Sequence, residues 1–242
     1  MMRRVLMVIA AVAVAAGAAG AALYARDSAP TAKPPTGACT DWFASPAYRR
    51  EINSVRALVP RMKRAFAAPG LSIAIAADGK LVWSQGCGFA DLGRRRAVTQ
   101  TTQFRVGSVS KTLTAATIAR LGQQGRLDVD DDIGQYVAGL PAGPAPTLRQ
   151  LGGHLGGIRH YEADEVINTR HYRSLADSLR IFINDPLVAP PGETFHYSSY
   201  GFNLLGVAVE RATNSRFASA VHAALLTPLR LGATTVGRPP AG

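Results

Sequence analysis

Residues 108–111 of the chain read Ser-Val-Ser-Lys and open a segment that is predicted to be helical as far as Gly122 or Gly125. The apolar side chains that recur at helical spacing in this segment are Leu113, Ala116 and Leu121. On a helix, Ser108 and Lys111 lie three residues apart on the same face, so their side chains are close together. A partly desolvated lysine can lose its proton and act on a serine hydroxyl. The motif therefore indicates a nucleophilic serine with a lysine base, although a capping serine beside an exposed lysine has the same spacing.

A second polar group, Tyr197-Ser198-Ser199, lies in a predicted loop before a helix over residues 202–212. A tyrosine near a lysine can share its proton and serve as an acid or base toward a leaving group. The Ser199 hydroxyl is suited to hydrogen-bonding the lysine or the substrate. Taken alone, Tyr197 fits equally well as a packed aromatic residue whose hydroxyl is satisfied.

The order of these parts resembles the serine β-lactamase-related hydrolases. This family includes class C β-lactamases, D-alanyl-D-alanine carboxypeptidases, β-lactamase-like esterases and a mitochondrial β-lactamase-like serine protease. The stretches that carry the resemblance are residues 104–111, 148–151, 154, 157–161, 190–193 and 195–202. The resemblance spans about residues 48–235 and is more specific than either motif alone. It implies an α+β fold of the β-lactamase/transpeptidase type, with an antiparallel sheet flanked by helices and a helical subdomain.

The resemblance also implies the roles of the site residues. Ser108 matches the acylated nucleophile, and its backbone N–H matches one half of the oxyanion hole. Lys111 matches the general base, Tyr197 the acid/base tyrosine, and Ser199 the substrate-binding third position of a Tyr-x-Asn motif. The implied substrate is a small molecule or peptide with an ester, D-amino-acid peptide or β-lactam carbonyl. No metal or organic cofactor is implied, because Ser, Lys and Tyr suffice for acyl transfer.

Two departures from the family pattern affect these expectations. Residues 154–157 read His-Leu-Gly-Gly where the family often has His-Thr-Ser-Gly, so His154 is predicted to be structural; His160 and His171 are predicted to be surface or packing residues. No Lys/His-Thr/Ser-Gly tripeptide follows Ser199. We therefore expect the C-terminal strands of the sheet to be missing, which would leave the 71–89 hairpin without neighbours. We expect the chain to be the N-terminal part of a longer protein; the alternative is an inactive, membrane-tethered binding or scaffold protein.

The N-terminal segment has the pattern of an export signal. Arg3 and Arg4 precede an uncharged run over residues 5–25, which predicts a cleaved signal or a retained membrane anchor. Residues 26–47 are predicted to be a flexible tether and residues 48–242 the hydrolase domain. The expected location is the periplasm or the outer face of the cytoplasmic membrane. Whether Cys39 and Cys87 pair stays open, because sequence does not show whether they meet.

The formal net charge of +11 raises the question of an anionic partner. The arginines are scattered, and no nucleic-acid-binding motif accompanies them, so no nucleic-acid partner is predicted; docking on an anionic wall polymer or lipid is a weaker hypothesis. The acidic run over residues 128–132 departs from a calcium loop and is predicted to provide helix caps and surface carboxylates. Oligomeric state cannot be predicted.

The remaining pattern predicts a helix over residues 52–62, with Pro60 in its last turn. A β-hairpin is predicted over residues 71–77 and 81–89, since Asp78-Gly79 is a strong two-residue turn signal. Further helices are predicted around residues 175–183 and over 217–226.

Overall fold

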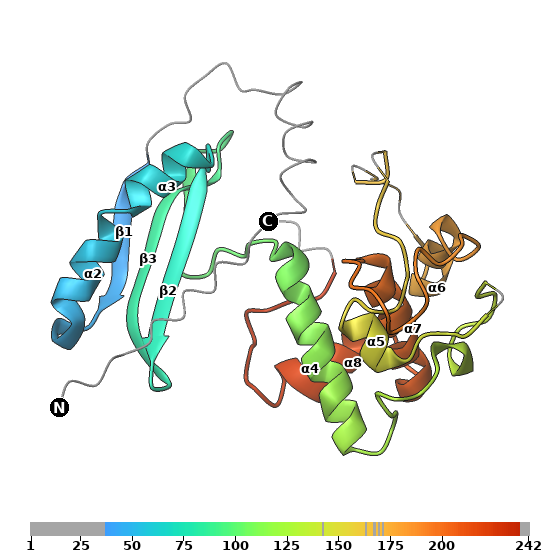
Figure 1. Cartoon of the computed structure of the whole chain (residues 1–242). Helices are drawn as coiled ribbons and strands as arrows, with labels where there is room; N and C mark the ends of the chain where they lie inside the picture. Colours follow the sequence, from blue (N-terminus) through green and yellow to red (C-terminus); the bar gives the residue numbers. More distant parts are fainter. Residues whose placement is uncertain are drawn as a thin grey trace. The chain divides into compact units, whose positions relative to one another are not determined.

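The computed structural model describes residues 37–237 except Ala142, Ala163, Ile167, Thr169 and His171. The export segment predicted at residues 1–25, the first part of the predicted tether and the predicted packing residue His171 lie outside the described residues. The chain divides into two compact units, one up to Thr102 and one from Gln103, whose elements are drawn in Figure 1.

The N-terminal unit is built on an antiparallel sheet in the order β1-β3-β2, with β4 pairing β3. The strands are β1 (Cys39–Ala44), β2 (Gly70–Ala77), β3 (Lys80–Asp91) and β4 (Arg96–Ala97). The predicted hairpin is confirmed: Asp78 and Gly79 have φ values of 50° and 72°, which an Asp-Gly pair adopts at little cost. The prediction of a tether over residues 26–47 was wrong for β1, which gives β3 a partner on its other side.

Two helices replace the single helix that was predicted over residues 52–62. They are α2 (Arg49–Arg56), which follows a short 3-10 turn η1 (Pro46–Tyr48), and α3 (Val59–Ala65). Pro60 lies in the first turn of α3, where its missing N–H has no helical partner to lose, so the chain begins a new helix there. Both helices pack along the sheet (Figure 1). The buried residues of this core are Ile52, Val59, Val82, Trp83 and Cys87.

A disulfide bond joins Cys39 of β1 to Cys87 of β3, which settles the pairing that the sequence left open. The two residues are register partners in the sheet, with Cα atoms 4.0 Å apart. Their sequence separation of 48 residues means that the bond closes a large loop in the unfolded chain. The loss of unfolded-state entropy for such a loop stabilises the fold by about 4 kcal/mol in the chain-entropy model.

The C-terminal unit is helical. Its main helices are α4 (Ser110–Gln123), α5 (Leu148–Gly152), α6 (Leu175–Ser178), α7 (Tyr200–Thr213) and α8 (Phe217–Val221). Short helical turns lie between them: η2 (Gly107–Val109), η3 (Ile133–Gln135), η4 (Leu179–Ile181) and the π-helical η5 (His222–Leu226). The predicted helices over residues 202–212 and 217–226 are confirmed, and the one around 175–183 ends at Ile181.

Helix α7 is the centre of this unit, because α4, α5, α6 and α8 all contact it. Leu204, Ala208 and Val209 of α7 are completely buried. The buried face of α4 consists of Thr114, Thr117, Ile118 and Leu121, whereas Ala116, which was predicted to help form the helix's apolar repeat, is exposed. The two threonines can be buried because their hydroxyls bond to the carbonyls of Ser110 and Leu113, one turn earlier.

The acidic run before α5 acts as caps and ion-pair partners, as predicted. Asp132 accepts a hydrogen bond from the Gly134 N–H at the start of η3. Asp130 forms a two-bond ion pair with Arg149, with distances of 2.6 and 2.9 Å. Neighbouring Asp131 accepts hydrogen bonds from the Tyr136 hydroxyl and the Asp128 N–H.

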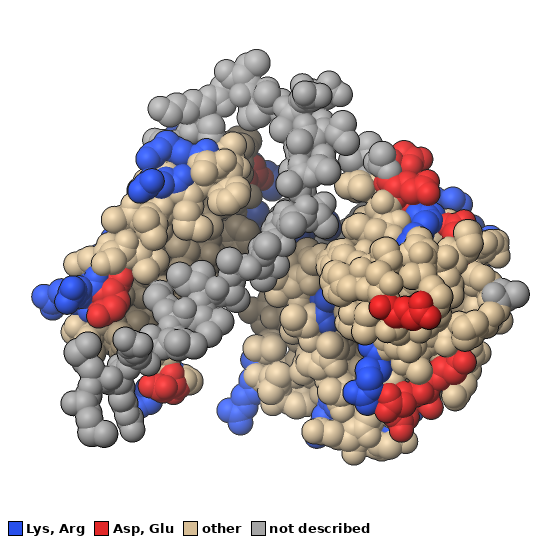
Figure 2. All heavy atoms as spheres, in the orientation of Figure 1, with Lys and Arg blue, Asp and Glu red and all other residues tan. Residues whose placement is uncertain are grey.

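Positive charge is unevenly distributed between the units. Residues 37–102 contain ten Lys/Arg and four Asp/Glu, whereas residues 103–237 contain twelve and eleven. Figure 2 shows Lys and Arg side chains gathered over α3, whose last turn carries Lys63 and Arg64. The excess positive charge therefore belongs mainly to the sheet-bearing unit.

Loss of the disulfide is expected to destabilise the N-terminal unit. Both tryptophans, Trp42 and Trp83, lie in this unit, so intrinsic fluorescence reports on it alone. The Cys39→Ser/Cys87→Ser variant should lose about 2–4 kcal/mol of unfolding free energy in urea titrations followed by tryptophan fluorescence. Reduced wild type should match the variant; equal midpoints for oxidised and reduced protein would contradict the expectation.

Gly157 is a position at which both backbone conformation and space exclude a side chain. Its φ is 68°, and a Cβ there would lie 2.1 Å from the carbonyl oxygen of Ala189. Gly157→Ala should cost about 3 kcal/mol or more in thermal unfolding, because strain and a backbone clash combine. Gly139→Ala is the matched control, since Gly139 also has positive φ (84°) but nothing lies near its Cβ position. We expect about 1 kcal/mol there, and equal losses at the two positions would refute the clash.

Candidate active site

Ser108 and Lys111 meet at the start of α4. Ser108 lies in η2, which leads directly into the helix, and Lys111 lies in the first turn of α4. The Lys111 Nζ donates a hydrogen bond to Ser108 Oγ at 3.1 Å. Ser108 is exposed and Lys111 half-buried, so the hydroxyl is accessible while the amine is partly shielded.

The chain brings Tyr197 and Ser199 to the same place from the loop before α7. The Tyr197 hydroxyl donates to Ser108 Oγ at 2.9 Å, although the two residues are 89 positions apart. Ser199, the residue immediately before α7, accepts a hydrogen bond from Lys111 Nζ at 3.1 Å. All four residues predicted from the sequence are therefore adjacent in the structure.

The aromatic faces of Tyr197 and Phe202 surround the lysine. Lys111 Nζ lies 5.0 Å from the ring centroid of Tyr197 and 5.5 Å from that of Phe202, within the range of a cation–π attraction. Burial of Tyr197 works to raise the pKa of its phenol, but hydrogen bonds with Lys111 and Ser108 and the lysine charge outweigh it. The net result is a Tyr197 pKa below the usual value of a tyrosine.

Two histidines that the sequence assigned only to structure or packing lie behind the Tyr197–Ser199 loop. His154 Nδ1 accepts a hydrogen bond from the Ser198 N–H at 3.2 Å, and His160 Nδ1 accepts one from the Ser199 N–H at 3.3 Å. Burial, followed by the charge of Lys111, lowers the pKa of both imidazoles. These contacts could not be predicted from the sequence, because the histidines lie 44 and 39 residues before their partners.

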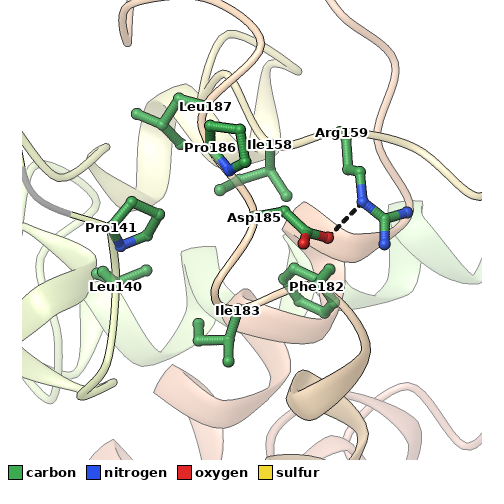
Figure 3. Close-up of a pocket in the computed structure, with 9 residues that line it drawn as sticks. All are labelled: Leu140, Pro141, Ile158, Arg159, Phe182, Ile183, Asp185, Pro186 and Leu187. Atoms are coloured by element: carbon green, nitrogen blue, oxygen red, sulfur yellow. Dashed lines mark hydrogen bonds and ion pairs between the residues drawn. The ribbon is translucent and has the colours of Figure 1, made fainter.

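Arg159 also contacts the Tyr197–Ser199 loop. The Ser198 hydroxyl donates to the Arg159 carbonyl at 2.7 Å and accepts from the Gly201 N–H at 3.0 Å. The Arg159 guanidinium forms ion pairs with Asp185 at 2.6 Å and with Glu165 at 2.7 Å. Figure 3 shows Arg159 and Asp185 side by side among residues that line an apolar cavity. Hydrogen bonding to Arg159 lowers the pKa of Glu165 to about 2, so this pair stays charged at ordinary pH.

The chemistry available at this site is that of a serine nucleophile with two adjacent proton carriers. In the described residues, no cluster of three or more His, Cys, Asp or Glu side chains is arranged to hold a metal ion. Ser108 Oγ lies within hydrogen-bond distance of both the lysine amine and the tyrosine hydroxyl, which is the geometry that general base catalysis requires.

The chain is similar to several known proteins. The Beta-lactamase family model matches residues 55–242. Human serine beta-lactamase-like protein LACTB, a mitochondrial protein, is 30% identical over 77% of this chain and 46% of its own length. The octameric penicillin-binding protein homologue from Pyrococcus abyssi has a TM-score of 0.65 at 25% identity, covering 74% of this chain and 43% of that one.

A class C beta-lactamase shares the fold at a TM-score of 0.67 and 23% identity, covering 82% of this chain and 54% of that one. The α+β, β-lactamase/transpeptidase-like fold implied by the sequence is therefore confirmed. The chain spans about half the length of the relatives it matches.

The opposite surroundings of two tyrosines provide a test of the site's electrostatics. Tyr197 should ionise below the usual tyrosine pKa of 10.0, whereas burial and the Asp131 carboxylate raise the pKa of Tyr136 to about 12. Ultraviolet titration of phenolate absorbance, taken as the difference between wild type and Tyr197→Phe, should therefore change at lower pH than free tyrosine. The difference with Tyr136→Phe is the control and should change at higher pH. A Tyr197 titration midpoint at or above the pH of free tyrosine would show that Lys111 does not act on the phenol as described.

Proposed function

Because the chain belongs to the Beta-lactamase family of serine hydrolases, we propose that it forms an acyl-enzyme on Ser108. The observation that carries the proposal is the convergence of Lys111 Nζ and the Tyr197 hydroxyl on Ser108 Oγ, at 3.1 and 2.9 Å. Family membership alone would not support an active site in a chain that spans about half of its relatives. The four polar groups of the site all lie in the described C-terminal unit.

In the proposed reaction, Ser108 Oγ attacks a carbonyl carbon while Lys111 takes the hydroxyl proton. The negative charge that develops on the carbonyl oxygen is stabilised by backbone N–H groups at the helix start, that of Ser108 among them. Tyr197 then delivers a proton to the leaving group, and its lowered pKa makes exchange with Lys111 easy. Water next attacks the acyl carbon and releases the acid, which restores the Ser108 hydroxyl.

Ester, peptide and β-lactam carbonyls all fit this scheme, so the proposed substrate class is an activated or strained carbonyl on a small molecule or peptide. The side chain of Ser199 is 8% exposed and is already bonded to Lys111. We propose that it completes the site by orienting the lysine and by offering its hydroxyl to a bound substrate.

We also propose that the protein is exported. The cationic and apolar pattern of residues 1–25 supports this, and the Cys39–Cys87 disulfide is typical of proteins that fold in oxidising compartments. Among the residues described by the structure, no helix has the length and apolarity needed to cross a bilayer.

Covalent labelling is the direct test. A fluorophosphonate or fluorescent penicillin probe should label the chain, and Ser108→Ala should abolish the label. Ser110→Ala is the matched control, since that serine lies in the same turn but donates to the Gly107 carbonyl at 2.7 Å. Lys111→Arg keeps the charge but does not readily give up a proton, so labelling should slow by roughly 10²- to 10⁴-fold.

Label that persists in Ser108→Ala would refute the assignment of the nucleophile. A folded wild-type chain that takes no label from either probe would contradict the proposed activity and favour the non-catalytic scaffold.

A further inference from the structure

The segment 196–199, which presents Tyr197 and Ser199 to the nucleophile, is fixed at successive backbone positions by two imidazoles. The N–H groups of Ser198 and Ser199 donate to His154 Nδ1 and His160 Nδ1, at 3.2 and 3.3 Å. The His196 N–H donates to the backbone carbonyl of His154 at 2.9 Å. Both histidines come from the segment between α5 and α6, so this segment fixes the one that precedes α7.

These hydrogen bonds define the protonation state of both rings. A backbone N–H can donate to Nδ1 only if that nitrogen has a free lone pair, so each imidazole is neutral and carries its proton on Nε2. A second proton on either ring would place two N–H groups against each other.

The Tyr197 ring contacts both imidazoles. Its centroid is 4.4 Å from that of His154, at a tilt of 36°, and 5.3 Å from that of His160, edge to face at 89°. His160 is in turn stacked on Tyr161 at 4.5 Å. The backbone bonds therefore fix the loop, while the two rings fix the plane of the phenol that reaches Ser108.

We propose that His154 and His160 are positioning residues for acyl transfer: as neutral imidazoles they hold Tyr197 and Ser199 on Ser108 and Lys111, and protonation of either ring releases them. This inference rests on the proposed function, because it assumes that the chemistry takes place on Ser108. Neither histidine touches the reacting atoms, so each acts only through the loop.

The groups facing the two rings determine how they respond to pH. Lys111, on α4, is the charged group nearest both, and the remaining titratable neighbours are Tyr161, Tyr197 and the other histidine. Burial and the lysine charge both oppose a further positive charge. The folded-state pKa of each histidine thus lies below its unfolded value of about 6.5, so the hydrogen bonds are intact above that pH and are lost as the pH falls through the folded-state pKa.

Paired substitutions separate positioning from bulk packing. In His154→Asn or His160→Asn, the Oδ1 atom can stand near the position of Nδ1 and accept the same hydrogen bond without titrating; His154→Leu and His160→Leu fill the space but accept nothing. The leucine variants should slow Ser108 labelling at pH 7.5 by on the order of tenfold or more, because misplaced catalytic groups lose rate steeply. The asparagine variants should stay within about threefold of wild type.

The pH profile gives the readout that a merely structural role would not change. Wild-type labelling should fall as the pH drops through the lowered folded-state pKa of these histidines, and the double variant His154→Asn/His160→Asn should lack this fall. His222→Leu, at an exposed position of η5, is the control and should leave both rate and profile unchanged. Equal rates for the leucine and asparagine variants, or a fall at the same pH in the double asparagine variant as in the wild type, would overturn the proposal.

Imidazole ¹⁵N NMR on the full chain tests the inference without any activity. At neutral pH, His154 and His160, assigned through the asparagine variants, should show an unprotonated Nδ1 and a protonated Nε2. A proton on Nδ1 of either ring would overturn the positioning role even if Ser108 reacts. If the wild-type chain shows the expected tautomers but takes no label, the proposed function is refuted. The tautomers would still support the hydrogen bonds by which His154 and His160 fix segment 196–199.

Discussion

The two hydrogen bonds of Lys111 Nζ, to Ser108 and to Ser199, join the beginnings of α4 and α7. These two helices pack against each other, and both contain completely buried residues: Thr117 in α4, and Leu204, Ala208 and Val209 in α7. The lysine is therefore held by the same helix packing that builds the core. A shift of either helix by one turn, about 5.4 Å, would separate Ser108 and Lys111 from Tyr197 and Ser199.

Two further sets of groups support this contact. Neutral imidazoles hold the tyrosine loop, and the guanidinium of Arg159 forms an ionic layer with the two carboxylates that pair with it. Arg159 is only 15% exposed in its side chain, and a charge so placed is tolerable because Glu165 and Asp185 compensate it. The Arg159 carbonyl, which accepts the Ser198 hydroxyl, connects this ionic layer to the catalytic loop.

The parts of the fold that the sequence predicts are those governed by neighbours in the chain. The Asp78-Gly79 turn and the extent of α7 follow from local preference, and the Ser108–Lys111 contact follows from helix geometry. The break between α2 and α3 was missed because the apolar repeat continues across Pro60. Strand β1 was missed because its pairing with β3 is a contact between residues far apart in the chain, which the local sequence of residues 39–44 does not show. The hydrogen bonds of His154 and His160 could not be predicted for a related reason: they depend on which backbone amides the tertiary fold brings to the two rings.

Cys39 and Cys87 both precede the catalytic segment in the chain, and this sets a sequence of events during synthesis. Strands β1–β4 and both cysteines of the covalent link have been translated before Ser108 is added. Tyr197 follows 89 residues after Ser108, so the cross-link can close while half of the catalytic residues do not yet exist. In an oxidising compartment, the N-terminal unit can therefore be locked before the reactive hydroxyl acquires its partners, and a nascent chain would not carry an assembled nucleophile until α7 has been made.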